Sequence, residues 1–397
     1  MPTIQDILQL LENTGHSPAV LRGTDGQKVV VVVPSLAGRV LCTGSAGLVG
    51  PTDSYILEDQ IRKGPIQTGP GVIWNNVGGE ERIWLGPEGG PHALFFSPGA
   101  AQRIENYWIP SALDLAPFQV TDVHRNGQYV TISAPASLNN YAGTHFDLEI
   151  TRRIEILDDC PFSAGAYPEF AFTGFESRTW VRNTGTQAWT RDSGALSIWT
   201  IGQFPGRRQT VVLLPFQPGA EAELGPPISM DDYLRMFYPE HPPRREEIGR
   251  LGEHCFQFRA NGDVMAKAEL PTRRCLGRIA SLDPDRLEMR IVQASVYPTL
   301  DYACSFVLPT TADPYSGGAM SSFSAARNLD EQSYYELESL SPALFLGPGE
   351  TFCHVSRTYH LRGDEQTIME ICRRHFFTTP SDLEDFERQR SRVTASC

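Results

Sequence analysis

Short runs in which apolar and polar residues alternate, or in which β-branched residues follow one another, recur along most of the chain and are typical of strands. Turns rich in glycine and proline separate these runs. The runs cover residues 29–33, 38–42, 82–85, 93–96, 118–123, 129–133, 145–157, 170–183, 195–201, 210–214, 255–259, 264–270, 275–282, 287–294, 303–308, 333–340 and 351–360. They predict roughly sixteen to eighteen strands and therefore a mostly β protein built as a large antiparallel sandwich.

Helical spacing of apolar residues is confined to a few places. Thr3 begins a capping box for a short amphipathic helix over residues 3–12. Residues 230–237 and 364–375 also have helical spacing, and Ser381 begins a capping box for a charged C-terminal helix. These helices are expected at the periphery of the sandwich.

The pattern contains no linker that would separate two domains, so we expect a single domain over residues 1–397. Its sandwich core is expected over about 20–362, and the C-terminal helical extension over 363–397.

The composition narrows the possible partners. A formal net charge of −13 leaves no basic footprint for nucleic acid or for anionic lipid, so neither is an expected partner. Eight scattered cysteines contain no C-x-x-C pair, which indicates buried free thiols rather than a zinc site or a disulfide framework. No apolar run approaches the ~18 residues of a membrane span, and the N-terminus lacks the features of a signal peptide. The expected location is cytoplasmic, unless a leader has been trimmed from the sequence.

Glu336 and Glu338 are the leading candidates for chemistry. They lie two residues apart in a predicted strand, so both side chains point to the same face of the sheet while Leu337 points to the other. An acidic pair on an inward face is unusual unless it binds or catalyses. The alternative is an edge strand with two solvated glutamates.

Residues 74–92 are the second candidate region, because they combine tryptophans, an arginine, a histidine and three glutamates between glycine-rich turns. Aromatic rings stack on sugars, while arginine, asparagine and glutamate satisfy hydroxyl groups. The candidate side chains are Asn75, Arg82, Trp84, Glu88 and His92. The alternative is a pair of core tryptophans beside an ordinary glycine turn.

Three further residues are candidates for the same site. Trp199 is one of three tryptophans in the middle of the chain, of which at least two are expected in the core. Tyr315 opens a glycine- and serine-rich stretch that is expected to form a loop at the rim of the site. Lys267 is either a buried partner of a carboxylate or a solvent-facing strand lysine. No spacing indicates a metal site, and no nucleotide-binding or hydrolase motif is present, so no cofactor is expected.

Taken in order, four segments resemble a bacterial branch of the galactose-mutarotase-like (aldose 1-epimerase-like) superfamily. The segments are Pro34–Val40, Asn76–Gly79 with Arg82–Gly90, Asn183–Gly185, and Tyr335–Ser339 with Leu346–Glu350. The resemblance implies a β-supersandwich with a few short peripheral helices. It also implies that Glu338, in the sequence Leu337-Glu338-Ser339, is the general base on a sugar.

The chain departs from that superfamily at both of its histidines. Val77 stands where a histidine precedes the Gly-Gly pair, and residues 196–199 read Leu-Ser-Ile-Trp where the second is expected. His92 or Glu336 then remains as the general acid, while Arg82 is a poor proton donor but can stabilise an oxyanion.

The sequence therefore predicts a carbohydrate-active protein. The first hypothesis is an epimerase- or mutarotase-type isomerase acting on a monosaccharide or sugar derivative, with a lyase or hydrolase less favoured. The second is a non-catalytic carbohydrate-binding or sensing protein that keeps the fold without the catalytic histidines. The sequence leaves the sugar and the oligomeric state open.

Overall fold

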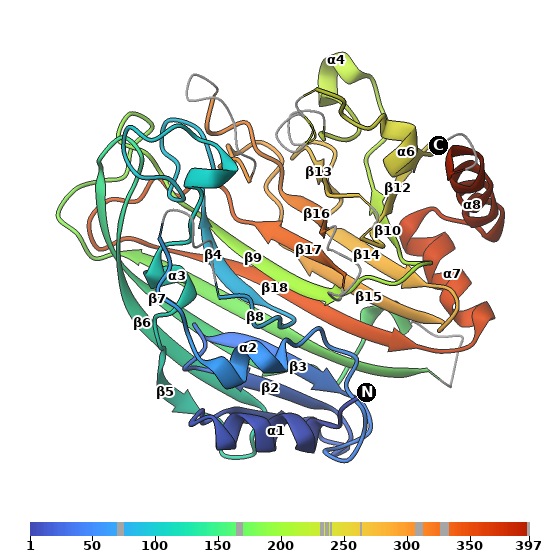
Figure 1. Ribbon diagram of the computed structural model, residues 1–397, viewed down its shortest axis with the longest axis horizontal. Coiled ribbons are helices and arrows are strands. Elements are labelled where there is room, and N and C mark those ends of the chain that lie inside the picture. The colour runs from blue at the N-terminus through green and yellow to red at the C-terminus, as the bar shows by residue number, and fades with distance from the viewer. Residues whose placement is uncertain are drawn as a thin grey trace.

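In the part of the chain that it describes, the computed structural model contains eighteen strands in three antiparallel sheets. It describes residues 1–69, 75–163, 170–230, 234, 238, 240–262, 264–305, 313–325 and 333–394. The mostly β, antiparallel architecture expected from the sequence is confirmed (Figure 1).

The largest sheet has ten strands and forms one whole layer of the molecule. In spatial order its strands are β11 (Gly249–Leu251), β12 (Cys255–Arg259), β10 (Val211–Pro215), β14 (Arg278–Asp283), β15 (Glu288–Ala294), β18 (Thr351–Arg362), β8 (Ala171–Asn183), β7 (His145–Ile156), β6 (Tyr129–Asn139) and β5 (Gln119–Val123).

The second layer combines a five-stranded sheet with a three-stranded sheet. The five strands are, in order, β13 (Ala266–Leu270), β16 (Met320–Ala325), β17 (Tyr334–Leu340), β9 (Ser197–Pro205) and β4 (Arg82–Gly86). The three strands are β1 (Ala19–Arg22), β2 (Val29–Val33) and β3 (Arg39–Gly44). A bridge between Val40 and Glu81 joins β3 to the start of β4, so the two smaller sheets lie side by side over the large one.

The main core lies between the two layers. It is a continuous apolar cluster with contributions from all three sheets, including Val32 of β2, Ile150 of β7 and Leu337 of β17. Because β2 is covered on both faces, all five of its valines are buried. That double burial explains why its sequence is a solid β-branched run rather than an alternating one.

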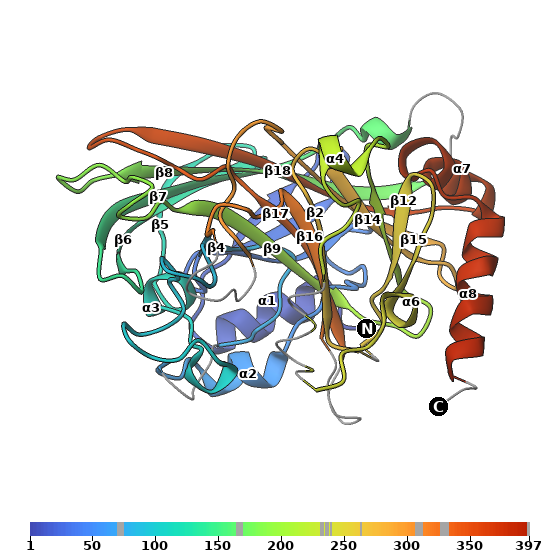
Figure 2. The same ribbon diagram turned by 90° about the horizontal axis from the view of Figure 1, so that it is seen from above.

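Helices cover the outer faces at the two ends of the sandwich. The outer face of the three-stranded sheet packs against α1 (Ile4–Asn13) and α2 (Glu58–Lys63), on the side away from the large sheet (Figure 2). At the other end, α7 (Glu365–Phe376) packs on β10, β14 and β15, and α8 (Pro380–Thr394) adds Phe386 to the same cluster. The remaining helices are short: α3 (Ser111–Asp114), α4 (Glu221–Leu224), α6 (Arg245–Ile248) and the single 3₁₀ turns Ile104–Asn106 and Pro161–Ser163.

Several element boundaries differ from the prediction. Residues 93–96 form bends rather than a strand, although all four side chains are buried in the main core. Residues 320–324, part of the stretch 315–324 that was expected to form a loop, belong to β16, which pairs with β13 and β17. The C-terminal capping box is made by Thr379 and Asp382, two residues before the predicted Ser381. Thr3 and Asp6 cap α1 as predicted. Most of the predicted helix 230–237, and part of the predicted strand 303–308, lie outside the described residues.

Candidate functional site

One face of the five-stranded sheet carries an unusual number of charged and polar side chains. Opposite residues of antiparallel strands share a face, so the register aligns them. These side chains, hereafter the polar face, are Arg82 and Trp84 of β4, Trp199 and Gln203 of β9, Glu336 and Glu338 of β17, Ser321 of β16, and Lys267 and Glu269 of β13.

The polar face points away from the ten-stranded sheet. The intervening residues of β17 contact that sheet instead: the Tyr335 hydroxyl lies 2.6 Å from Ser281 Oγ, and Ser339 Oγ lies 2.9 Å from His354 Nε2. Side chains alternate along a strand, so Glu336 and Glu338 project to the opposite side. β17 is an interior strand between β16 and β9, which rules out an edge strand with solvated glutamates.

Glu338 is fully buried and is held through one of its two carboxylate oxygens. Oε2 accepts hydrogen bonds from Trp199 Nε1 at 2.8 Å, Lys267 Nζ at 2.7 Å and Ser321 Oγ at 3.0 Å. Oε1 is buried and has no hydrogen-bond partner among the described residues. The carboxylate is therefore fixed in orientation, with one oxygen left over for a ligand.

Glu336 has its own cation. Arg82 Nη2 donates to Glu336 Oε1 at 2.8 Å, and Gln203 Nε2 donates to the same oxygen at 3.2 Å. Burial raises the pKa of Glu336, the Arg82 guanidinium opposes that shift, and the neighbouring Glu338 charge adds to it. Arg82 also lies over the Trp84 ring, 4.5 Å from its centroid.

Two further carboxyl groups flank these ion pairs. Tyr107 donates its hydroxyl to Glu88 Oε1 at 2.9 Å, and Ser305 donates to Glu269 Oε2 at 2.8 Å. Burial raises the pKa of Glu88 to about 7, and it raises that of Glu269 to about 7 as well, in each case against the opposing charge of Lys267. Both groups are therefore poised to hold or release a proton near neutral pH.

Charge balance explains why these two groups are the ones that hold protons. Arg82 and Lys267 are the cations ion-paired with Glu336 and Glu338. Burial lowers the pKa of Lys267, but the opposing charges, of which the Glu338 carboxylate is the largest, outweigh burial, so the pKa is raised and Lys267 remains an ammonium. With both cations paired, a further buried carboxyl is more stable when protonated.

Aromatic rings form the apolar part of the site. The rings of Trp84 and Trp199 meet edge to face with centroids 5.5 Å apart, and Phe95 packs against both. Lys267 Nζ lies 4.6 Å from the Trp199 ring centroid. Trp199 is thus both a core residue and a hydrogen-bond donor to Glu338, a combination that the alternatives drawn from the sequence did not include.

Three of the candidate residues lie elsewhere. The His92 ring stacks near Tyr315, with centroids 6.2 Å apart, and the Tyr315 hydroxyl accepts a hydrogen bond from the backbone of Ala195. Asn75 binds Asp114 and the backbone of Ile66. No hydrogen bond in the described part of the chain joins these three residues to Glu338.

The structure adds polar residues that the sequence did not single out. Gln203, Ser321 and Glu269 belong to the polar face, and Tyr107 binds Glu88 from a loop. Lys267 and Glu269 repeat the two-residue spacing of Glu336 and Glu338. This spacing is the feature of the sequence from which Glu269 could have been predicted as a site residue. Within the described residues no group of three or more His, Cys, Asp and Glu side chains is arranged to hold a metal ion.

The structure also describes most of the cysteines and the helices, about which we drew expectations from the sequence. The seven described cysteines are free, and six of them are buried, as expected for structural thiols. None of the helices in the described ranges is both long and apolar enough to cross a membrane.

Comparison with solved structures places the fold. The Slr1438 protein from Synechocystis sp. PCC 6803 is 12% identical, with a TM-score of 0.50 over 88% of this chain and 96% of that one. A galactose mutarotase-like protein from Lactobacillus casei ATCC 334 is 10% identical, with a TM-score of 0.50 over 87% of this chain and 100% of that one. The galactose-mutarotase-like fold expected from the sequence is confirmed.

Sequence comparison is more limited. No curated protein matches the chain. A model of a family of unknown function, DUF6786, matches residues 3–386, which is nearly the full length. The chain therefore belongs to the DUF6786 family.

Proposed function

We propose that the polar face is the active site of an epimerase- or mutarotase-type enzyme that acts on a monosaccharide or a sugar derivative. Glu338 is the general base. The observation that carries the proposal is the hydrogen bonding of Glu338: Oε2 is fixed by three donors, while Oε1 is buried and has no partner among the described residues.

Buried polar atoms without partners need an explanation, because each one costs free energy unless a ligand or water satisfies it. Glu88 Oε2 and Gln203 Oε1 share this property with Glu338 Oε1 among the described side chains. Glu338 Oε1 and Gln203 Oε1 are acceptors, and protonated Glu88 can donate from Oε2, so the three atoms suit a ligand rich in hydroxyl groups, which both donate and accept. A sugar has that chemistry, and Trp84 and Trp199 supply the apolar surface on which a pyranose ring packs.

The second proton carrier in this proposal is Glu88. A general acid works best when its pKa is near the working pH, and burial raises that of Glu88 to about 7. Glu338 removes the proton of the anomeric hydroxyl while Glu88 gives its proton to the ring oxygen, so the ring opens. Closure on the other face of the carbonyl returns both protons and inverts the anomeric carbon.

Glu336 and His92 remain the other candidates for the acid. Glu336 already binds Arg82, so its proton would have to compete with that ion pair. His92 lies beside Tyr315 rather than beside Glu338, and burial lowers its pKa, which makes it a weaker proton carrier at neutral pH. These contacts favour Glu88.

A specific observation supports a second candidate function, a non-catalytic sugar-binding protein. The Glu338 carboxylate is neutralised by Lys267 at 2.7 Å, and no histidine among the described residues binds it. A carboxylate held in this way can serve purely as a hydrogen-bond acceptor for ligand hydroxyls.

Anomer exchange separates the two functions. Saturation-transfer NMR on a panel of neutral and acidic monosaccharides measures exchange for the wild type, for Glu338→Gln and for Glu88→Gln, against the uncatalysed rate. The enzyme proposal predicts exchange in the wild type and a loss of at least about 100-fold in both variants. Lys63→Met, on an exposed residue, is the control and should retain full exchange. Ligand contacts without exchange for every sugar would identify a binding protein.

A further inference from the structure

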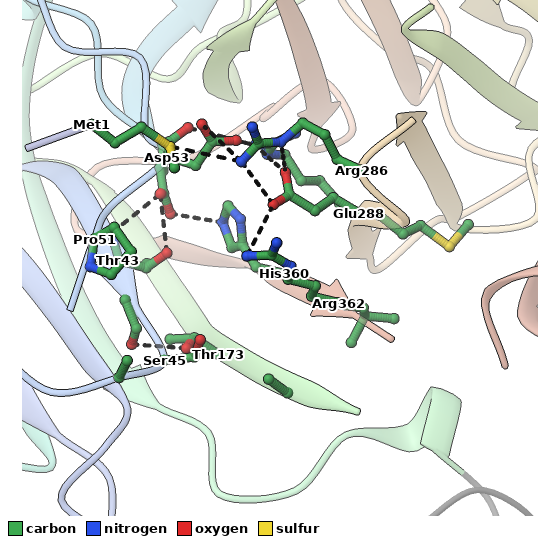
Figure 3. A pocket seen from close by; sticks show the side chains of 17 residues that line it. Met1, Thr43, Ser45, Pro51, Asp53, Thr173, Arg286, Glu288, His360 and Arg362 are labelled. Atoms are coloured by element: carbon green, nitrogen blue, oxygen red, sulfur yellow. Dashed lines mark hydrogen bonds and ion pairs between the residues drawn. The ribbon is translucent and has the colours of Figure 1, made fainter. Parts of the chain in front are cut away.

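A cavity lies on the other side of β17 from the polar face. Its volume is about 310 Å³, within the range of small-molecule sites. Residues 43–46 of β3 and its following turn, Asp53, and the facing ends of β8, β15 and β18 line it (Figure 3). Arg290 shows that the cavity and the polar face are on opposite sides of β17. It lines the cavity and contacts the hydroxyl of Tyr335, whose side chain points away from Glu338.

Three arginines line this cavity, hereafter the arginine cavity, together with the carboxylates of Asp53, Glu80 and Glu288. Arg286, Arg290 and Arg362 line it, and in Figure 3 Arg286 and Arg362 lie around Glu288. Glu288 contacts all three guanidinium groups, at 2.9 Å for Arg286, 4.0 Å for Arg290 and 3.8 Å for Arg362. One carboxylate is therefore shared by three cations.

Asp53, which also lines the cavity, is shared in the same way. It contacts Arg207, Arg286 and Arg290, and Arg207 also contacts Asp283. Four guanidinium groups thus share three carboxylates: Arg207, Arg286, Arg290 and Arg362 with Asp53, Asp283 and Glu288. The remaining carboxylate of the cavity wall, Glu80, has a separate partner in His360 Nε2 at 2.8 Å.

Two of the arginines have donors left over. Arg290 is nearly completely buried, and its Nε has no hydrogen-bond partner among the described residues. Arg362 stands at the opening with its side chain 63% exposed, and its ion pair with Glu288 is long at 3.8 Å. A buried guanidinium donor without a partner, next to an exposed guanidinium, is an arrangement that an incoming anion completes.

We propose that the arginine cavity is a binding site for a small molecule with a phosphate or carboxylate group. The site is distinct from the polar face and does not depend on the function proposed for it. Arginine is suited to both groups because its planar fork donates two parallel hydrogen bonds to paired oxygens. The formal net charge of the chain is −13, so a cluster of four guanidinium groups is not a general property of its surface.

Isothermal titration of the full chain with inorganic phosphate and, separately, with malonate tests the proposal at low ionic strength. The variants are Arg362→Gln, which removes the exposed guanidinium, and Ser45→Phe, which places a large ring at an exposed position of the cavity wall. Arg125→Gln is the matched control, because it removes the same charge at an exposed position outside the cavity.

The proposal predicts saturable binding of at least one anion to the wild type. Affinity should fall about tenfold or more in Arg362→Gln and be lost in Ser45→Phe, while Arg125→Gln binds as the wild type does. Saturation by phosphate alone, malonate alone or both identifies the preferred group. Absence of saturable binding for both anions overturns the proposal, and so does equal weakening in Arg362→Gln and Arg125→Gln. Sugar binding by Arg362→Gln should be unchanged, which separates this result from any failure at the polar face.

Discussion

The Lys267–Glu338 ion pair offers the sharpest test of how the polar face is held together. Lys267→Met keeps the length and apolar stem of the side chain but removes the ammonium group. Glu338 then keeps Trp199 and Ser321 as neutral donors and loses its charged partner. We expect the folded protein to be destabilised, because a buried carboxylate is left without a cation.

The structure sets the magnitude. The two side chains are 3% and 0% exposed and their charged atoms are 2.7 Å apart. With an effective dielectric constant of about 20, the direct attraction is about 6 kcal/mol. Desolvation of both groups cancels part of this attraction, and breaking one partner of a buried pair costs about 3–5 kcal/mol. Replacing both partners should cost much less, because Lys267→Met with Glu338→Leu leaves no unpaired charge.

Equilibrium urea unfolding of the two single variants and the double variant forms the assay, with Lys63→Met as a control on an exposed lysine. The double-mutant cycle should give a coupling of at least about 2 kcal/mol between Lys267 and Glu338. A coupling below about 0.5 kcal/mol would refute the reasoning.

Three further predictions concern stability and pH. Burial raises the pKa of Glu88 and of Glu269 from 4.5 to about 7, so each group stabilises the folded state fully below about pH 4.5 and loses that contribution, about 3 kcal/mol, as the pH rises through about 7. The free energy of unfolding measured from pH 5 to 9 should therefore fall less steeply in Glu88→Gln than in the wild type. An identical slope would contradict this. Gly202→Ala should cost about 1–3 kcal/mol in thermal unfolding, because the new methyl group would lie 2.3 Å from the Glu80 carbonyl oxygen, and a neutral effect would show that β9 can shift. Thr3→Ala should cost about 1 kcal/mol through loss of the α1 cap, whereas Thr3→Ser should retain stability.

The positions of most strands were predictable from the sequence because the alternation that indicates a strand lies within the few residues of that strand. β17 and β18 were expected from alternation and turn residues, and both are present. β16 was not expected, because serines and small residues have no apolar alternation. It forms a strand since β13 and β17 pair with it on both sides, which is tertiary context that no local pattern contains.

The site was predictable only in part, for the same reason. The shared face of Glu336 and Glu338 follows from their spacing alone. That Lys267 reaches Glu338 depends on the register of β13 on β16 and of β16 on β17, across 71 residues of sequence. Sequence alone left Lys267 either paired or solvent-facing, and the pairing decides between these alternatives.

The polar face has more carboxyl groups than cations. A sheet face that binds no ligand would be expected to match its cations and carboxylates one to one, because a surplus buried charge is costly. Here Arg82 and Lys267 face four carboxyl groups, and the surplus groups, Glu88 and Glu269, are the ones whose pKa is raised to about 7. The protein thus keeps protonated acids beside a charged carboxylate, at a cost in stability above pH 7 that packing alone would not select. That arrangement suits the proton exchange with a hydroxyl-bearing ligand that we propose.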